Sequence, residues 1–317
     1  MKHYLLVNFG GPRNLEEVAP FLQALLCDRD VIRTRFPNFI HNFLFSRIAR
    51  KRSVTVAEDY QEIGGCSPIY NDTENLAKAL SEKLNAPVLT FHRYLPSTHK
   101  ESLEKINAIP NLTVIPLFPQ FCYATTGSIA RFFSTRVSSS LQWVKSYPAH
   151  PAFIRATERR IGQFLIEKNL DHKDTVLLFS AHGIPQTFID LGDIYKTECE
   201  RSFTEVLKAF PKTLGKLCYQ SKFGRGEWLR PYTNEVCEDA LNWNKGRKNV
   251  VFIPISFTSD HIETLFEIEK LYLPVIQTKN LNAYRCPSLN LEPYWIEALA
   301  EIAQDTNLSS SQMLYIN

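Results

Sequence analysis

Short apolar runs alternate along the chain with longer amphipathic stretches. The short runs are rich in β-branched and aromatic residues and predict buried strands, whereas apolar residues spaced by three and four predict helices. This alternation is typical of βα units around a parallel sheet. The predicted strands cover 3–9, 87–92, 112–118, 174–180, 216–220, 249–255 and 273–277. The predicted helices cover 14–26, 55–63, 71–84, 99–107, 127–138, 151–169, 195–210, 231–243, 258–270 and 291–305.

A proline-rich passage, YPAHPAF at 147–153, divides the pattern into two halves. Two prolines end one element there before a long helical pattern begins. We therefore expect two α/β domains, 1–150 and 151–317, and the last helix could pack back on the first half. Each half contains a strand that runs into a glycine-containing turn, NFGGP at 8–12 and SAHGIP at 180–185. Sites in open α/β sheets form at the carboxyl ends of strands, so these turns are the first candidates.

The composition is that of an ordinary globular protein, with 44% hydrophobic and 22% charged residues among 317. The formal net charge is only +3, whereas general nucleic-acid binders carry a large basic excess, so we expect no nucleic-acid partner. Seven cysteines are scattered without a CxxC pair, and the apolar run near the N-terminus is too short for a signal peptide. Both features favour a reducing, cytoplasmic location. Three prolines interrupt the longest uncharged stretch, 106–130, so we expect no transmembrane helix.

Positive charge is concentrated in residues 29–52, which carry seven Lys and Arg against one Asp, a local net charge of +6. Between the cations, apolar residues recur at helical spacing: Phe36, Phe39, Ile40, Phe43, Leu44 and Ile48. Spacing alone favours a helix that packs on the core and has a solvated basic end. The alternative is an apolar lip backed by cations, which could receive a flat apolar molecule bearing carboxylates or rest on an anionic membrane.

His182, in LLFSAHGIP, lies where a predicted strand ends and a turn begins. An imidazole takes up and releases protons near neutral pH, which makes a histidine at such a position a candidate for proton transfer or metal binding. A loop histidine bonded to the nearby backbone is the simpler alternative.

A cluster of acids follows another predicted strand, in FTSDHIETLFEIEK at 257–270. On an α-helix, Asp260, Glu263 and Glu267 would share one face because positions i, i+3 and i+7 align. Capping of the helix start would account for one or two of these acids but not for the whole set. Together with His261 they offer nitrogen and oxygen ligands that suit a transition-metal ion.

Several enzyme classes lack their signatures in this chain. No GxGxxG, Walker GxxxxGK[ST] or GxSxG pattern is present, which argues against dinucleotide oxidoreductases, kinases and α/β-hydrolases. The H-x-E of HIE matches half of the zinc deaminase pattern, but its PCxxC half is missing, so zinc deamination is excluded.

A series of longer motifs extends over nearly the whole chain. In order, they are LLVNFGGP (5–12), YQEIGGCSPI (60–69), HRYLP (92–96), PLFPQF with ATTGS (116–128), LLFSAHGIP (177–185), QSKFG with WLRPYT (220–233) and PISFTSDHIETL (254–265). Over residues 3–305 the chain resembles the ferrochelatase family, and SAHGIP followed by TSDHIETL is the most specific part of the likeness. The resemblance implies an α/β fold of two similar flavodoxin-like halves, with parallel four-stranded sheets and a porphyrin cleft between them.

The resemblance also implies an activity, the insertion of Fe²⁺ into a free-base porphyrin, most simply protoporphyrin IX, with release of two protons. It implies that His182 accepts those protons or binds the metal, that Glu263 is its carboxylate counterpart, and that Asp260, His261 and Glu267 support them. The side chains that match porphyrin-contacting positions of the family are Phe9, Arg52, Tyr60, Ser67, Arg93, Tyr94, Gln120, Tyr147 and Trp228.

The resemblance also bears on cofactors and partners. Phe9 stands where relatives carry Met, Leu or a metal-coordinating Tyr, so a phenolate ligand is excluded at this position. The chain ends at Asn317 without the cysteine-bearing extension of animal relatives, so we expect no iron–sulfur cluster and no tightly bound cofactor, with Fe²⁺ as a substrate. Peripheral membrane contact through 37–52 is a further expectation, because protoporphyrin is poorly soluble.

Three other activities remain open at this point. Coproporphyrin III could be the substrate, since only the arginines around the ring would distinguish the two porphyrins. A cobalt or nickel chelatase for a sirohydrochlorin-type ring would be shorter and would lack QSKFG and TSDHIETL. A haem or porphyrin carrier could use His182 as an axial ligand, but such a pocket has no need of the acidic row.

Overall fold

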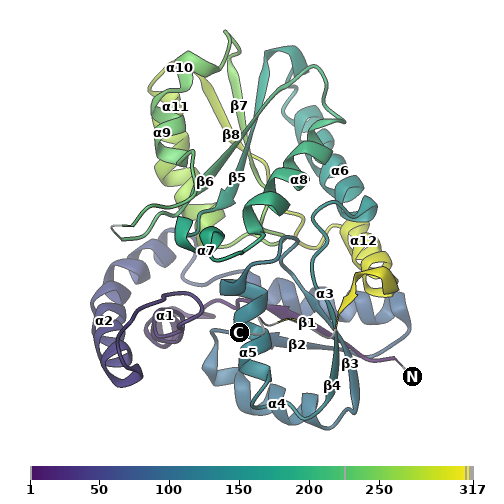
Figure 1. Cartoon of the computed structure of the whole chain (residues 1–317). Coiled ribbons are helices and arrows are strands. Elements are labelled where there is room, and N and C mark those ends of the chain that lie inside the picture. The colour runs from purple at the N-terminus through teal and green to yellow at the C-terminus, as the bar shows by residue number, and fades with distance from the viewer. Residues whose placement is uncertain (1, 225, 311–312, 314–317) are drawn as a thin grey trace. The chain divides into compact units, whose positions relative to one another are not determined.

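The chain folds into two compact units in a computed structural model, which describes residues 2–224, 226–310 and 313 (Figure 1). The first unit comprises Met1–Ser146 together with Leu299–Asn317, and the second comprises Tyr147–Ala298. The division at 146/147 falls at the start of the proline-rich passage, and the expected end of the second half at residue 317 lies outside the described residues.

The first unit is built on a five-stranded sheet with the strand order β2-β1-β3-β4-β9. The first four strands are parallel, and the two-residue strand β9 pairs antiparallel with β4 at the edge. The strands are β1 (Tyr4–Asn8), β2 (Val88–His92), β3 (Asn111–Pro116), β4 (Ser140–Val144) and β9 (Ser309–Ser310). The helices are α1 (Val18–Leu26), α2 (Asn38–Glu62), α3 (Ile69–Leu84), α4 (His99–Asn107) and α5 (Ser128–Phe133), with a π-helix at Tyr123–Gly127.

Alternate strand residues form the core of this unit, because successive side chains of a strand point to opposite faces of the sheet. On one face, Leu5 and Val7 are fully buried with Ile106 of α4 and with Ile129 and Phe133 of α5. This packing leaves the carboxyl ends of the parallel strands, and the turns that follow them, to carry the polar side chains.

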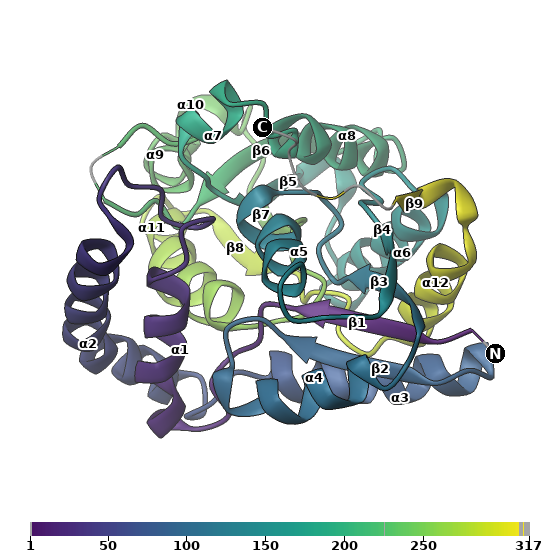
Figure 2. The ribbon, with the colours of Figure 1, turned by 60° about the horizontal axis from the view of Figure 1, so that its bottom comes forward.

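Helices α1 and α2 lie side by side, away from the sheet (Figure 2). Along α2, His41, Phe45 and Ala49 are buried, whereas Phe39 and Phe43 are 74% and 66% exposed. The core-facing interpretation of the phenylalanine-rich pattern is therefore wrong for Phe39 and Phe43. The helix instead presents an apolar surface next to its cations.

The second unit is built on a four-stranded, fully parallel sheet with the strand order β6-β5-β7-β8. The strands are β5 (Thr175–His182), β6 (Leu214–Gln220), β7 (Asn249–Pro254) and β8 (Asn282–Arg285). The helices are α6 (Pro151–Glu167), α7 (Gln186–Asp190), α8 (Tyr195–Leu207), α9 (Thr233–Glu238), α10 (Ala240–Trp243) and α11 (Leu273–Gln277), with a ten-residue π-helix at Glu263–Tyr272. Helix α12 (Pro293–Gln304) begins in this unit, and its residues from Leu299 onward belong to the first unit.

Helices cover both faces of this second sheet, with α6 and α8 on one side and α9 and α11 on the other (Figure 1). On the second of these faces, Leu178 and Phe252 of the central strands are buried with Val236 of α9 and with Ile268 and Ile276. The two central strands are thus buried on both faces, as their continuous apolar sequences predict.

The two units repeat one strand order, since β2-β1-β3-β4 and β6-β5-β7-β8 each place the first strand between the second and third. This order is flavodoxin-like, so the predicted fold class is confirmed. The sequence prediction missed β4, the four-residue strand β8 and the antiparallel edge strand β9. It also assigned 273–277 to a strand, but this segment is α11, which continues the π-helix and buries Ile276 in the core.

No helix among the described residues is long and apolar enough to cross a membrane.

Candidate active site

The second sheet has a topological switch point between β5 and β7. These strands are hydrogen-bonded neighbours, but the chain leaves β5 towards β6 on one side and returns to β7 on the other. In open α/β sheets, ligand sites form outside the carboxyl ends of two such strands. His182 is the last residue of β5, and the segment that carries Glu263 follows β7.

His182 has a fixed backbone and an accessible imidazole. Its backbone N–H donates to Ser256 Oγ at 3.1 Å, and its carbonyl oxygen accepts a hydrogen bond from the Tyr195 hydroxyl at 3.0 Å. The side chain is 35% exposed, and its Nε2 lies 3.6 Å from Glu263 Oε1. That distance is longer than a hydrogen bond, so the imidazole and the carboxylate lie close together without a direct hydrogen bond.

The Glu263 carboxylate lies between two imidazoles. Its second oxygen is 3.6 Å from Nε2 of His261, and Nδ1 of His261 lies 3.1 Å from the Ser259 carbonyl oxygen. Burial by itself would raise the pKa of Glu263, but His182 and His261 outweigh this effect, and the pKa lies below its ordinary value. Burial would likewise lower the pKa of His261, but the hydrogen-bonding and charge interactions with Glu263 outweigh it and raise this pKa. Glu263 is therefore the anionic group of the site.

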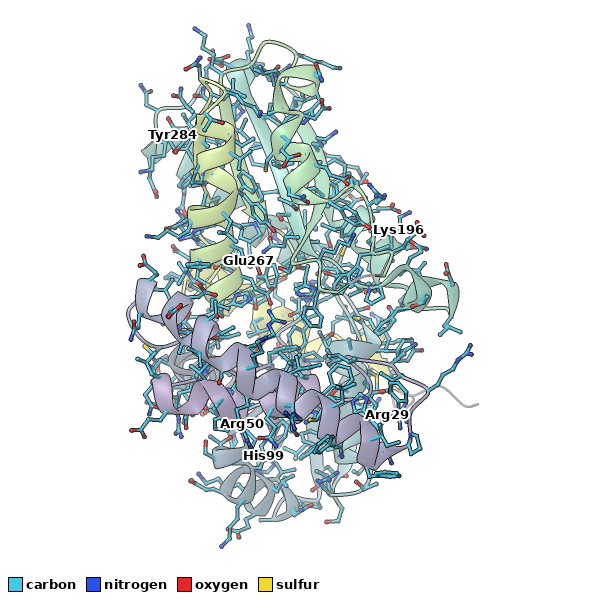
Figure 3. The ribbon with its side chains drawn as sticks, turned by 90° about the vertical axis from the view of Figure 1, so that its left-hand side faces the viewer. Arg29, Arg50, His99, Lys196, Glu267 and Tyr284 are labelled. Atoms are coloured by element: carbon cyan, nitrogen blue, oxygen red, sulfur yellow. The ribbon has the colours of Figure 1, made fainter. Side chains whose placement is uncertain are left out.

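Glu267 lies one turn further along the π-helix, in the second unit (Figure 3). Its Oε2 accepts hydrogen bonds from Ser221 Oγ at 2.6 Å and from Gln220 Nε2 at 3.3 Å. Burial, followed by the charge of Glu263, raises the pKa of Glu267 to about 7. The pKa of Glu267 thus lies above the ordinary value and that of Glu263 lies below it. Near neutral pH, Glu267 can therefore hold a proton while Glu263 is charged.

Gln220 sets the geometry of this acidic pair. It is the last residue of β6 and lies opposite His182 in the register of the sheet. Its amide oxygen accepts from Ser180 Oγ at 2.7 Å, and its amide nitrogen also donates to the Glu263 carbonyl oxygen at 2.9 Å. Gln220, which pairs with His182 in the sheet, is therefore hydrogen-bonded directly to the first residue of the π-helix.

Asp260 does not join Glu263 and Glu267 on one helical face, so that prediction is wrong. The helix begins after Asp260, and its first ten residues are π-helical, which changes the α-helical spacing on which the prediction rested. The Asp260 carboxylate is instead hydrogen-bonded to Arg285 at the end of β8 and to Ser288 and Asn290 on the segment that follows this strand. Burial would raise its pKa, but Arg285 and the other donors outweigh this and lower it.

Trp228 lies close to His182, with 6.4 Å between the ring centroids. Gly183 makes this approach possible, because a Cβ at this position would come within 2.8 Å of the Gln220 carbonyl oxygen and 3.3 Å of the Trp228 ring. Gly183 also donates its N–H to that carbonyl at 2.8 Å. The SAHGIP turn thus requires a glycine here, because the backbone of Gln220 and the ring of Trp228 lie too close for a larger side chain.

Phe9, Arg93 and Tyr94 of the first unit lie just beyond the carboxyl ends of β1 and β2. The ring of Phe9 packs against that of Tyr94 with 4.6 Å between centroids. Arg93 and Tyr94 both donate to Asp28 Oδ2, at 2.6 and 2.9 Å, and the Arg93 guanidinium lies 4.5 Å from the ring centroid of Phe132. Both side chains are thus fixed by contacts within their own unit.

The other side chains matched to porphyrin contacts differ in exposure. Arg52 lies on the exposed surface of α2, whereas Tyr60, near the end of the same helix, is 2% exposed. Ser67 is buried against Gly11, where a Cβ would come within 2.6 Å of it. Gln120 follows β3 and is buried. Tyr147 is buried in the second unit, with its ring 5.7 Å from that of Phe153.

Four residues at this site were not assigned a role from the sequence: Gln220, Ser221, Arg285 and Asn290. Gln220 and Ser221 belong to QSKFG, and both Gln220 and Arg285 are the last residues of strands. The rule that sites form at carboxyl ends would have found Gln220. It could not find Arg285, because β8 was not predicted.

No group of three or more His, Cys, Asp and Glu side chains within the described part of the chain has the geometry of a metal site.

Comparison with known proteins identifies the family. The family model described as Ferrochelatase matches residues 4–307. The chain belongs to the ferrochelatase family. It is 48% identical to the ferrochelatase of Chlamydia abortus over 96% of this chain and 95% of that protein, and 44% identical to that of Chlamydia trachomatis serovar A over 98% of each. Like other ferrochelatases it is a lyase, a metal chelatase, and the family acts on a porphyrin and ferrous iron.

Solved structures support the ferrochelatase fold at lower sequence identity. One describes CbiX as the terminal enzyme for biosynthesis of sirohaem in denitrifying bacteria, with a TM-score of 0.53, 14% identity, and coverage of 74% of this chain and 92% of that one. Another is SirB from Bacillus subtilis with Fe³⁺, with a TM-score of 0.52, 13% identity, and coverage of 97% and 98%. At these identities the likeness shows a shared chelatase-type fold.

Proposed function

We propose that the porphyrin substrate is protoporphyrin IX and that His182 and Glu263 carry out the insertion of Fe²⁺. The observation that carries this proposal is the approach of His182 Nε2 to Glu263 Oε1, 3.6 Å apart at the switch point of the second sheet. This pair combines a nitrogen base with an ionised carboxylate, which are the two groups that the exchange of two protons for one cation requires.

In the proposed reaction, one divalent cation replaces two protons of the porphyrin. Fe²⁺ forms bonds to four pyrrole nitrogens, two of which first lose an N–H proton, so the products are haem and two protons. His182 accepts a proton from the ring through its neutral imidazole. Glu263 supplies the negative charge that attracts the hydrated cation while it loses water. Glu267, whose pKa is about 7, takes up a proton and releases it to solvent.

For the porphyrin, we propose contacts by Phe9, Arg52, Arg93 and Trp228, which are the members of the matched set that are not buried. The exposed phenylalanines of α2 favour a ring with apolar vinyl groups and two propionates over one with four propionates. An open depression of about 610 Å³ along this helix is lined by Phe43 together with Arg47, Arg50 and Lys51. Figure 3 shows Arg50 on α2, and Arg29 beside the N-terminal end of this helix.

The choice of porphyrin can be tested by anaerobic insertion of Fe²⁺, followed by absorbance, with protoporphyrin IX and coproporphyrin III in separate reactions. We expect kcat/KM to be at least about tenfold higher for protoporphyrin IX, because the exposed rings of Phe39 and Phe43 suit apolar vinyl groups better than charged propionates. A preference for coproporphyrin III would contradict the proposed substrate. Tight binding of both rings without turnover of either would favour a carrier.

We also propose that the α2 surface contacts anionic membranes. Phe39 and Phe43 are exposed next to Arg47, Arg50 and Lys51, and an apolar face beside cations binds anionic lipid interfaces. Replacing Phe39 and Phe43 by Ser should reduce co-sedimentation with phosphatidylserine-containing vesicles about tenfold or more. Burial of each phenylalanine ring in the lipid interface contributes ~2 kcal/mol to the free energy of binding.

The control for the vesicle experiment is Ile166→Ser, since Ile166 is 80% exposed on a helix of the second unit without a comparable basic cluster. Phe45 is left unchanged because it is buried and its loss would disturb the fold. Equal co-sedimentation of the wild type and the double variant would refute the proposed contact.

A further inference from the structure

The Asp260 carboxylate accepts four side-chain hydrogen bonds from residues of the second unit. Its Oδ1 accepts from Arg285 Nη1 at 2.8 Å, from Thr264 Oγ1 at 2.9 Å and from Ser288 Oγ at 3.1 Å, and its Oδ2 accepts from Asn290 Nδ2 at 2.9 Å. The Asp260 backbone N–H donates to Asn290 Oδ1 at 2.7 Å. A buried carboxylate bound by four side-chain donors is fixed in position, so we infer that its contribution is structural.

Arg285 connects two points of the segment that carries Glu263. Its Nη1 donates to Asp260, just before the π-helix, and its Nε donates to Glu269 Oε1 at 2.7 Å, within the π-helix. The Arg285 side chain is only 10% exposed, and the residue ends β8, which is in register with Phe252 of β7. The planar guanidinium fork therefore binds two carboxylates at once from a rigid strand end.

Glu263 lies between the two anchored residues, three positions after Asp260 and six before Glu269. The residue before the π-helix, Ile262, makes no side-chain capping hydrogen bond, so contacts of neighbouring side chains, those of Arg285 with Asp260 and Glu269 among them, hold this part of the chain in place. A displacement of the first turn would move the Glu263 carboxylate away from His182, because His182 belongs to β5 and stays with the sheet.

We propose that Arg285 is a positioning residue for metal insertion: through Asp260 and Glu269 it fixes the first turn of the π-helix and so keeps the Glu263 carboxylate at its distance from His182. This inference rests on the proposed roles of His182 and Glu263. Arg285 itself contacts neither the ring nor the metal, and it acts only through the two carboxylates that it binds.

The test is Arg285→Lys, which keeps the charge but replaces the fork by a single ammonium group that reaches one carboxylate at a time. Steady-state insertion of Fe²⁺ into protoporphyrin IX should show kcat about tenfold lower, because a small misplacement of a reacting group is costly in rate. The dissociation constant for protoporphyrin IX, measured by quenching of tryptophan fluorescence, should stay within about twofold of the wild-type value.

Two further variants separate positioning from loss of structure. Arg230→Lys changes an exposed Arg–Glu pair in the same unit and should leave kcat unchanged. Glu269→Gln removes the charge of Glu269, which at 41% exposure is the more exposed of the two carboxylates that Arg285 binds. This variant should lower kcat by about threefold and leave the hydrogen bond between Arg285 and Asp260 in place. If Arg285→Lys does not fold, the result with Glu269→Gln decides.

A wild-type kcat in folded Arg285→Lys would overturn the inference, as would a loss of kcat matched by an equal weakening of porphyrin binding. His182→Ala in the same assay distinguishes a failure of the proposed roles of His182 and Glu263 from a failure of the positioning role of Arg285. If His182→Ala retains full turnover, the proposed roles of His182 and Glu263 fail and the inference fails with them. If His182→Ala loses turnover while Arg285→Lys does not, only the positioning role fails.

Discussion

Replacing His182 by Ala should lower kcat for insertion of Fe²⁺ into protoporphyrin IX by about a thousandfold, since a positioned general base contributes ~10²–10⁴-fold. The backbone of this residue is bonded to Ser256 and Tyr195 and does not depend on the imidazole. The side chain is 35% exposed, so its removal leaves no closed cavity. Anaerobic stopped-flow absorbance, with the thermal midpoint measured in parallel, tests this expectation.

The matched control is His172→Ala, which removes a histidine of the same unit that packs on Phe210, away from the switch point. Its kcat should equal that of the wild type. Undiminished insertion by His182→Ala would remove His182 from the chemistry, and the proposed mechanism would then have no base at the carboxyl end of β5.

The stability of the metal-free protein should fall as pH rises, and Glu267 is the main cause. Its pKa is about 7 in the folded chain, above the ordinary value of 4.5, because of burial and the nearby charge of Glu263. Between these two values the unfolded chain has lost the proton while the folded chain keeps it, so the free energy of unfolding decreases with pH. The loss amounts to about 3 kcal/mol once the pH exceeds 7, at 1.36 kcal/mol per pKa unit.

Glu267→Gln removes this titration but keeps a side chain of similar shape that can accept from Ser221. The free energy of unfolding of the variant relative to the wild type should therefore increase by about 3 kcal/mol between about pH 4 and pH 8. Urea unfolding across this range measures it, with the exposed Glu238→Gln as control. A pH-independent difference between Glu267→Gln and the wild type would show that Glu267 ionises normally in the folded protein.

The strands of the second unit illustrate how far sequence patterns lead. β5 and β7 are continuous apolar runs buried on both faces, and the pattern predicts both within two residues at each end. β8 has only four residues, of which one is fully buried, so its pattern carries little information. The run LPVIQ is rich in branched side chains, and only the preceding π-helix decides that it is helical.

The candidate site shows the same division. His182 and Glu263 stand out in the sequence because each follows an apolar strand, and parallel strands end at a common edge. Arg285 gave no such signal, because its partners are 25 and 16 residues away along the chain. Asp260 was assigned to the wrong face because α-helical spacing was applied to a segment that forms a π-helix.

The sequence by itself determined the alternation of strands and helices, the family, and the two motifs that carry the candidate chemistry, because these depend on local hydrophobic periodicity and on residue order. Only the tertiary structure decided that the phenylalanines of α2 are exposed, that Glu263 lies 3.6 Å from both His182 and His261, and that Arg285 anchors Asp260. These features depend on which strands become neighbours and on which helical repeat a segment adopts. The choice of neighbouring strands and the helical repeat are both determined by contacts between residues that are distant in the chain. The local sequence pattern contains no information on such contacts.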